Sequence, residues 1–138
     1  MLENAILFAT KAHKGQKDKG GKPYILHPLR VMLCCKKQEE QITAILHDVL
    51  EDTNSTKEDL QKAGFSDEIV EAVVCLTKQK NEDYFDYIHR VKQNKIARIV
   101  KLADLEDNMD LKRLLTVTEK DKARVQKYQE AKELLEKC

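Results

Sequence analysis

Apolar residues recur at three- and four-residue spacing along most of the chain, a pattern typical of amphipathic helices. No segment has the alternation and length of a credible strand, and three of the four glycines cluster with Pro23 between residues 15 and 23. The pattern therefore predicts an all-α fold, a bundle of about seven to eight helices with one early irregular loop. The predicted helices cover residues 2–13, Pro28 to Leu33, 39–52, Thr56 to Gly64, Ser66 to Thr77, Asn81 to Val91, 95–110 and 118–136, with Thr56, Ser66 and Asn81 as N-caps.

The size and charge of the chain limit the kinds of protein it can be. With 138 residues it is long enough for one domain with a buried core and short for two, so we expect a single domain over residues 1–138. Its 25 basic and 24 acidic residues are interspersed, which argues against nucleic acid as a main partner. No window has the roughly 18 apolar residues of a membrane span, and the first residues lack a signal-peptide pattern. These features predict a cytoplasmic protein with no membrane segment, and they leave its oligomeric state open.

The cysteines fit neither the spacing of a zinc site nor a secreted disulfide framework. We therefore expect reduced thiols. Cys34, Cys35 and Cys75 lie in apolar stretches and are predicted to pack in or near the core, whereas Cys138 is predicted to be exposed and easily oxidised.

Metal-competent side chains interrupt the apolar helical stretches at three places. His47 and Asp48 follow an apolar run, His27 stands before Pro28, and Asp104 follows another apolar run. An ionised aspartate on an apolar face is costly unless it is paired or metal-bound. Two imidazoles and two carboxylates form a mixed nitrogen and oxygen ligand set, which suits a divalent ion of the manganese or iron kind. The predicted metal ligands are His27, His47, Asp48 and Asp104.

Glu51 and Asp52 add two carboxylates to the predicted helix 39–52. If that helix is continuous, each lies one turn beyond a predicted ligand, Glu51 beyond His47 and Asp52 beyond Asp48. A divalent metal can turn water into a nucleophile near neutral pH, and neighbouring carboxylates can orient that water or carry its proton. The pattern therefore indicates a phosphohydrolase with Glu51 and Asp52 as catalytic residues. Each element alone also has a structural explanation, since a buried histidine is often a hydrogen-bonded core residue and Asp104 is a possible ion-pair partner of Lys101.

Three ordered motifs carry a resemblance to a known family. They are Ala12-His13-Lys14-Gly15-Gln16 with Lys19, Pro23-Tyr24-Ile25 and His27-Pro28; His47-Asp48-Val49-Leu50-Glu51-Asp52-Thr53; and Val100-Lys101-Leu102-Ala103-Asp104 with Asn108. In these motifs the chain resembles the HD-domain metal-dependent phosphohydrolases, and more closely the hydrolase domain of the RelA/SpoT family and its single-domain relatives. The resemblance implies an all-helical fold, manganese on His27, His47, Asp48 and Asp104, catalytic help from Glu51 and Asp52, and removal of pyrophosphate from the 3′ position of guanosine tetra- or pentaphosphate.

Four further residues are candidates for binding the nucleotide. Lys19 lies in the lysine- and glycine-rich loop 14–22, which is able to approach a polyphosphate closely or is simply a solvated loop. Asn108, one turn past Asp104, is a candidate for ribose or phosphate binding, or a helix-capping amide. Arg124 and Tyr128 resemble a pair that lines the nucleotide pocket in the single-domain relatives, although Tyr128 also fits a core position.

Two positions depart from the pattern of the family. Asp18 stands where the RelA/SpoT hydrolases usually carry an arginine, and Leu105 where a basic residue is common. Both changes remove cations from the predicted rim of the site and put the alarmone substrate in question. The alternatives are therefore a phosphohydrolase for another nucleotide or phosphorylated metabolite, a catalytically silent nucleotide sensor, and, last, a purely structural bundle.

Overall fold

The computed structural model describes residues 1–137, so the prediction for Cys138 lies outside the described residues. It is all-α, as the sequence predicts, and its described part has no strand, only one isolated bridge between Lys17 and Pro23. Nine α-helices and one 3-10 turn are present over these residues: α1 (Leu2–Ala12), α2 (Leu26–Leu33), α3 (Gln38–Leu46), α4 (Val49–Asp52), α5 (Lys57–Lys62), α6 (Asp67–Cys75), α7 (Tyr84–Lys92), α8 (Lys95–Asn108), η1 (Leu111–Arg113) and α9 (Glu119–Glu136). Among residues 1–137, no helix is both long and apolar enough to cross a membrane.

Helix α3 forms the centre of the core and packs against α1, α2, α6 and α8. Its residues Ile45 and Leu46 are fully buried, and Ile42 is 3% exposed. The sequence of α3 is apolar on several faces because the helix has neighbours on several faces. On α1, Ala5 and Ala9 are fully buried, and these small side chains allow α1 to lie close to α3.

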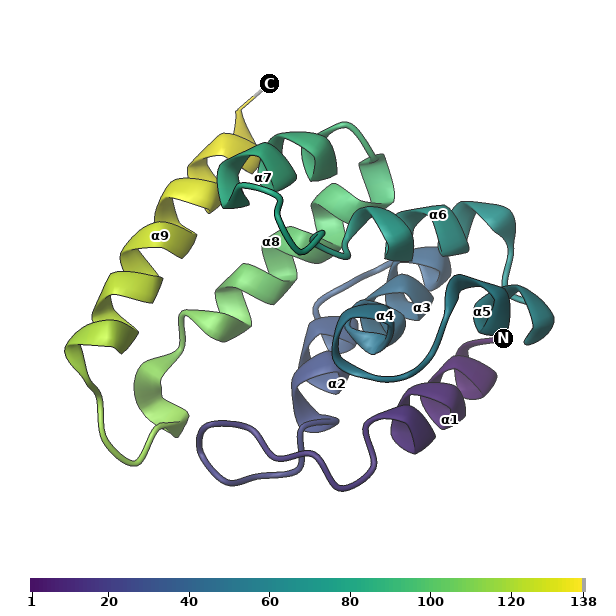
Figure 1. Ribbon diagram of the computed structural model, residues 1–138, viewed down its shortest axis with the longest axis horizontal. Helices are drawn as coiled ribbons and strands as arrows, with labels where there is room; N and C mark the ends of the chain where they lie inside the picture. The colour runs from purple at the N-terminus through teal and green to yellow at the C-terminus, as the bar shows by residue number, and fades with distance from the viewer. Residues whose placement is uncertain (138) are drawn as a thin grey trace.

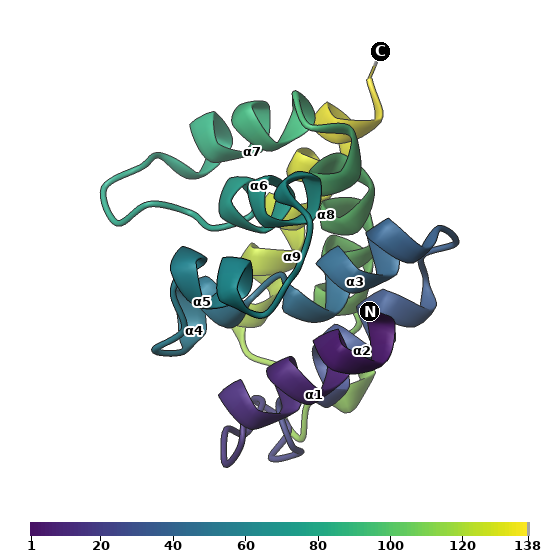
Figure 2. The same cartoon turned by 90° about the vertical axis from the view of Figure 1, so that its right-hand side faces the viewer.

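Helices α8 and α9 form the other side of the molecule and lie side by side, as Figures 1 and 2 show. The segment between them, which contains η1, meets the loop 14–22 at the lower edge of Figure 1. At this meeting point a Cβ on Gly20 would lie 2.5 Å from the backbone oxygen of Arg113, so only glycine permits the approach. Two loops that are far apart in the sequence therefore border one region of the surface.

The structure corrects several local predictions. The predicted helix 39–52 is interrupted at His47 and Asp48, which is why there are more helices than expected. The N-cap of α7 is Asp83 rather than Asn81, because the carboxylate of Asp83 accepts the backbone N–H groups of Phe85 and Asp86. Cys35 is buried and Cys75 partly buried, as predicted, but Cys34 is exposed because it follows the last turn of α2.

Candidate metal centre and substrate cavity

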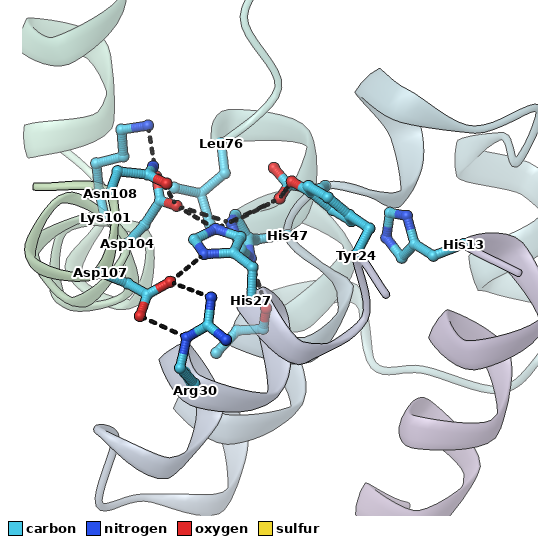
Figure 3. A network of polar contacts seen from close by, with 12 residues as sticks. His13, Tyr24, His27, Arg30, His47, Leu76, Lys101, Asp104, Asp107 and Asn108 are labelled. Atoms are coloured by element: carbon cyan, nitrogen blue, oxygen red, sulfur yellow. Dashed lines mark hydrogen bonds and ion pairs between the residues drawn. The ribbon is translucent and has the colours of Figure 1, made fainter. Parts of the chain in front are cut away.

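A buried cluster of His27, His47 and Asp104 joins three helices. Their side chains offer one ligand atom each, and these atoms lie within 4.8 Å of one another. His27 comes from α2, His47 from the end of α3 and Asp104 from α8, and Figure 3 shows them converging. Residues that are 20 to 77 positions apart in the chain therefore form one potential ligand set.

The break between α3 and α4 directs two consecutive side chains to this cluster. In a regular helix, neighbouring residues point about 100° apart and do not face each other. At the break, Asp48 Oδ2 lies 3.1 Å from His47 Nε2 and 3.8 Å from His27 Nε2. All four predicted metal ligands thus lie together, because the chain leaves the helix at the two residues that need to share a site.

His47 is oriented by the backbone. Its Nδ1 lies 2.6 Å from the carbonyl oxygen of Ala44. A carbonyl can only accept a hydrogen bond, so Nδ1 carries a proton and Nε2 is directed at Asp104 and Asp48. Burial lowers the pKa of His47, but the negative charges of Asp48 and Asp104 outweigh it and raise the pKa well above its ordinary value, so a metal ion would displace a proton from Nε2. This arrangement is the one that a metal-binding histidine requires.

His27 is oriented by a carboxylate that the sequence analysis did not assign to the site. Its Nδ1 donates to Asp107 Oδ2 at 2.6 Å, while its Nε2 lies 2.8 Å from Asp104 Oδ1. Asp107 in turn accepts hydrogen bonds from Arg30 Nε at 2.7 Å and from Arg113 Nη2 at 3.3 Å. The ring of His27 is therefore held between two carboxylates, and Asp107 is fixed by Arg30, as Figure 3 shows, and by Arg113.

The two ligand carboxylates are also held from outside the cluster. Asp104 accepts hydrogen bonds from Lys101 Nζ at 2.8 Å and Asn108 Nδ2 at 3.1 Å. Asp48 accepts one from the hydroxyl of Tyr24 at 2.5 Å. Burial opposes ionisation of Asp104, but the positive charge of Lys101 outweighs it and lowers the pKa of this carboxyl well below its ordinary value.

This cluster fits a divalent cation. Two imidazole nitrogens and two carboxylates are a donor set for borderline divalent metals, and each donor is fixed by a second hydrogen bond. Buried carboxylates at such short separation from imidazoles need a positive charge between them, either shared protons or a cation. The chemistry of the donor set and the orientation of the imidazoles therefore match a metal centre.

Glu51 and Asp52 lie on α4, next to the cluster. Glu51 Oε1 accepts the backbone N–H of Lys78 at 2.9 Å, so this oxygen is fixed and the other remains available. The backbone oxygen of Asp52 accepts a hydrogen bond from the side-chain amide of Gln16, which anchors the end of α4. Burial raises the pKa of both carboxyl groups above their ordinary values.

Two adjoining cavities open beside the cluster. The smaller, about 220 Å³, is bordered by the carboxylates of Asp48, Glu51, Asp52 and Asp104 and by Lys78, Tyr84, Tyr87 and Lys101. The larger, about 350 Å³, lies between the loop 14–22, the η1 segment and the start of α9. Both cavities are bordered by Tyr24, His27, Asn108 and Tyr128, so they are compartments of one site.

The four predicted substrate-binding residues all line the larger cavity. Lys19 comes from the loop 14–22. Asn108 also reaches Asp104, as described above, and Arg124 forms an ion pair with Asp121 one turn before it. The ring of Tyr128 lies 6.3 Å from that of Tyr84, which places it at the wall between the compartments.

The two departures from the family pattern have structural roles. Asp18 borders the larger cavity, but its Oδ1 accepts the backbone N–H groups of Gly20 and Lys22 at 2.9 Å and so shapes the loop. Leu105 is fully buried in the core, so the prediction that it lies on the rim is wrong. Leu105 borders neither of the two cavities, and a basic residue at this position would be buried in the core.

Sequence reasoning missed four residues that support the site: Tyr24, Arg30, Asp107 and Arg113. It gave the ion pair between Lys101 and Asp104 only as an alternative to metal binding, whereas the structure has that pair beside the cluster. Helical spacing offered a partial signal. Arg30 lies three residues after His27, Lys101 three before Asp104 and Asp107 three after it, so each shares a face with a ligand. Nothing in the sequence indicated that Asp107 and His27, which are 80 residues apart, would meet.

Comparison with known proteins agrees with this geometry. The sequence model of the HD domain matches residues 5–134. The chain is 34% identical over 120 residues to the guanosine-3′,5′-bis(diphosphate) 3′-pyrophosphohydrolase of Aquifex aeolicus and 34% identical over 122 residues to the bifunctional (p)ppGpp synthase/hydrolase SpoT of Escherichia coli. Each match covers 78% of this chain and 17% of the relative, so the chain spans about a sixth of the length of these curated relatives.

A solved structure has the same fold. It is described as a metazoan orthologue of SpoT that hydrolyses ppGpp, and it matches 98% of this chain and 85% of its own with a TM-score of 0.79 at 24% identity. The family-model match covers nearly the whole chain. The histidine and aspartate cluster lies where the three sequence motifs of this chain come together. The chain therefore belongs to the HD domain family.

Proposed function

We propose that this chain is a metal-dependent phosphohydrolase that removes pyrophosphate from the 3′ position of guanosine 3′,5′-bis(diphosphate), with manganese as the metal. The observation that carries the proposal is the buried cluster of His27, His47 and Asp104, with the carboxylate of Asp48 beside it, at the junction of two cavities. The names of the curated relatives supply the substrate. The cytoplasmic location stays a prediction.

In this proposal, the phosphorus–oxygen bond is cleaved at the cluster. A divalent cation held by His27, His47, Asp48 and Asp104 would make water more acidic and offset negative charge on a phosphoryl oxygen. Glu51 and Asp52 border the same compartment, and their raised pKa values make them better proton acceptors than ordinary carboxylates. In the proposed step, water adds to the phosphorus and gives a proton to one of these carboxylates. The bond between phosphorus and the 3′ oxygen breaks, and the 3′ oxygen takes up this proton and leaves as a hydroxyl group, so the products are pyrophosphate and the 5′-diphosphate.

The larger cavity holds the remainder of the nucleotide in this proposal. Its lining includes five cations, Lys17, Lys19, Arg30, Arg113 and Arg124, and three carboxylates, Asp18, Asp110 and Asp121. Each of these carboxylates already accepts hydrogen bonds from neighbouring groups of the chain. The cavity is therefore suited to an anionic ligand, with Lys19 and Arg124 at the phosphates and Asn108 and Tyr128 near the sugar.

The test is release of pyrophosphate from guanosine tetraphosphate by the manganese-loaded protein and by Asp48→Ala. We expect the variant to lose hydrolysis and to bind manganese much more weakly, because one carboxylate ligand is gone. Asp86→Ala, which removes an exposed carboxylate from α7, is the matched control and should keep full activity. Full activity in Asp48→Ala would refute the assignment of the site.

Another phosphorylated nucleotide is the second candidate substrate. The observation that favours it is Asp18, which adds a carboxylate to the wall of the larger cavity. A panel of nucleotides offered to the same protein separates the two candidates. If the protein binds manganese and turns over another member of the panel but not guanosine tetraphosphate, the result would assign that other nucleotide as the substrate.

A further inference from the structure

Tyr84 carries a buried hydroxyl that none of the described protein groups pairs with. Its oxygen is inaccessible to solvent, and within residues 1–137 no group lies at hydrogen-bond distance from it. Leaving a buried hydroxyl unpaired destabilises a fold, so such groups in native proteins usually have a functional explanation. The other buried tyrosine of α7, Tyr87, shows the usual arrangement, since its hydroxyl donates to the backbone oxygen of Leu76 at 2.6 Å.

Tyr84 lies at the cavity that the predicted metal ligands also border. It is the first residue of α7 and lines the smaller cavity together with Asp48 and Asp104. Its ring is fixed by neighbours: the ammonium of Lys127 lies 4.1 Å from the ring centroid, and the rings of Phe85 and Tyr128 lie at 5.4 and 6.3 Å. The hydroxyl is thus held in place by packing without any hydrogen bond of its own.

The sizes of the two compartments indicate what each one holds. Sites for whole small-molecule ligands usually measure about 300 to 1,000 Å³. The larger cavity, at about 350 Å³, is in this range, whereas the smaller, at about 220 Å³, is below it. If the proposed function holds, the smaller compartment takes only the phosphoryl part of the substrate, and this part faces Tyr84.

We propose that the Tyr84 hydroxyl is a catalytic hydrogen-bond donor to a non-bridging oxygen of the pyrophosphoryl group that is cleaved. This inference rests on the proposed function for the identity of that group. Negative charge on these oxygens grows or shifts as the bond to the 3′ oxygen breaks, and a donor already fixed in place stabilises it without reorganisation. Tyr84 keeps its proton throughout, so the balance of the step is unchanged.

The surroundings of Tyr84 agree with a donor role. Burial raises the pKa of Tyr84 to about 12, so the hydroxyl is protonated at neutral pH. The ammonium of Lys101 borders the same compartment and already donates to Asp104 at 2.8 Å. Tyr84 is therefore the neutral donor in a compartment whose charged donors are partly engaged by the ligand carboxylates.

Tyr84→Phe tests the proposal, because it removes the hydroxyl and keeps the ring. We expect kcat for guanosine tetraphosphate to fall by roughly 10- to 100-fold, with KM changed by less than about threefold, since the interaction strengthens as charge develops. The Tm of the metal-free protein should stay the same or rise, because an unpaired buried hydroxyl is removed. Tyr87→Phe is the stability control and should lower the Tm, because its hydroxyl is paired.

A second measurement separates this proposal from the proposed function. Inorganic pyrophosphate is titrated into the manganese-loaded wild type and into Tyr84→Phe by calorimetry. If the wild type hydrolyses no nucleotide but binds pyrophosphate, and the variant binds it at least about threefold more weakly, the hydroxyl is a donor to a pyrophosphoryl group, whereas the proposed function and the catalytic part of the donor role fail. If the wild type is active and the variant has the same kcat and KM, the donor role is wrong and the proposed function stands. A drop in kcat accompanied by an equal loss of folded protein would also overturn the donor role.

Discussion

Replacing Asp107 by alanine should weaken metal binding by about 10- to 100-fold, although Asp107 itself is not one of the proposed ligands. Its carboxylate accepts the Nδ1 proton of His27 at 2.6 Å and so fixes both the tautomer and the direction of the ring. Outer-shell partners of metal-binding histidines typically change metal affinity by this factor. Without Asp107, the imidazole can rotate and its Nε2 no longer has a fixed position opposite Asp104.

The structure also gives the expected loss of stability. His27 is 5% exposed, so its unpaired Nδ1 group would cost about 1 to 3 kcal/mol. Arg30 and Arg113 would each lose a carboxylate partner, but both side chains are 31% exposed and can be hydrated, so each adds only about 0 to 1 kcal/mol. We expect a total of about 1 to 5 kcal/mol, which corresponds to a Tm lower by roughly 3 to 20 °C.

Manganese affinity is measured by competition with a chelator, and the Tm is measured on the metal-free protein. Asp107→Asn should have an intermediate affinity, because the amide oxygen can still accept the Nδ1 proton but carries no charge. Asp110→Ala is the matched control, since Asp110 pairs with the same Arg113 but does not touch His27, and its affinity should remain within about twofold of wild type. A folded Asp107→Ala protein with wild-type manganese affinity would refute the orienting role.

Three further predictions concern the stability of the fold. Arg90→Leu should lower the free energy of unfolding by about 2 to 3 kcal/mol, because the guanidinium binds Glu82 and two backbone carbonyls at the end of α6. Urea titrations measure this loss, and an unchanged free energy of unfolding would contradict the prediction. The hydrogen bonds from Arg90 lower the pKa of Glu82 from 4.5 to about 2, so this pair stabilises the protein above pH 4.5 and its contribution is lost as the pH falls toward 2. The difference in unfolding free energy between wild type and Glu82→Gln should therefore be present at pH 7 and shrink over that range; a constant difference would contradict the pairing. Gly20→Ala should lower the free energy of unfolding by about 1 to 3 kcal/mol, because its Cβ would lie 2.5 Å from the backbone oxygen of Arg113. An unchanged Tm would show that the two loops do not meet this closely.

The sequence by itself determined the class of fold and the kinds of side chain at the centre. Helical spacing of apolar residues is a local property, so most helices were predicted to within a few residues. The charged and imidazole groups at His27, His47, Asp48 and Asp104 stood out because they interrupt apolar stretches, where their burial needs an explanation. Their assignment as one site came from their order along the chain together with the resemblance to the HD domain.

Only the tertiary structure decided how these groups meet and what supports them. The break at His47 and Asp48 is not visible in the apolar pattern, because it is stabilised by contacts with α2 and α8 rather than by local preferences. The sequence analysis gave Asp107 no role, and its pairing with His27 and Arg30 depends on the packing of α8 against α2. Leu105 was predicted to lie on the rim because it follows Asp104 in the sequence, but the sequence does not show that its side chain is buried in the core.

The unpaired hydroxyl of Tyr84 is the clearest case of a feature that folding alone creates. In the sequence, Tyr84 is one of several apolar positions of an amphipathic helix, and its ring does pack as that pattern predicts. Whether its hydroxyl finds a partner depends on groups from other helices, and hydrogen bonds act only over about 3 Å. The sequence therefore sets which chemical groups are present, and the packing of distant segments sets which of them remain available to a ligand.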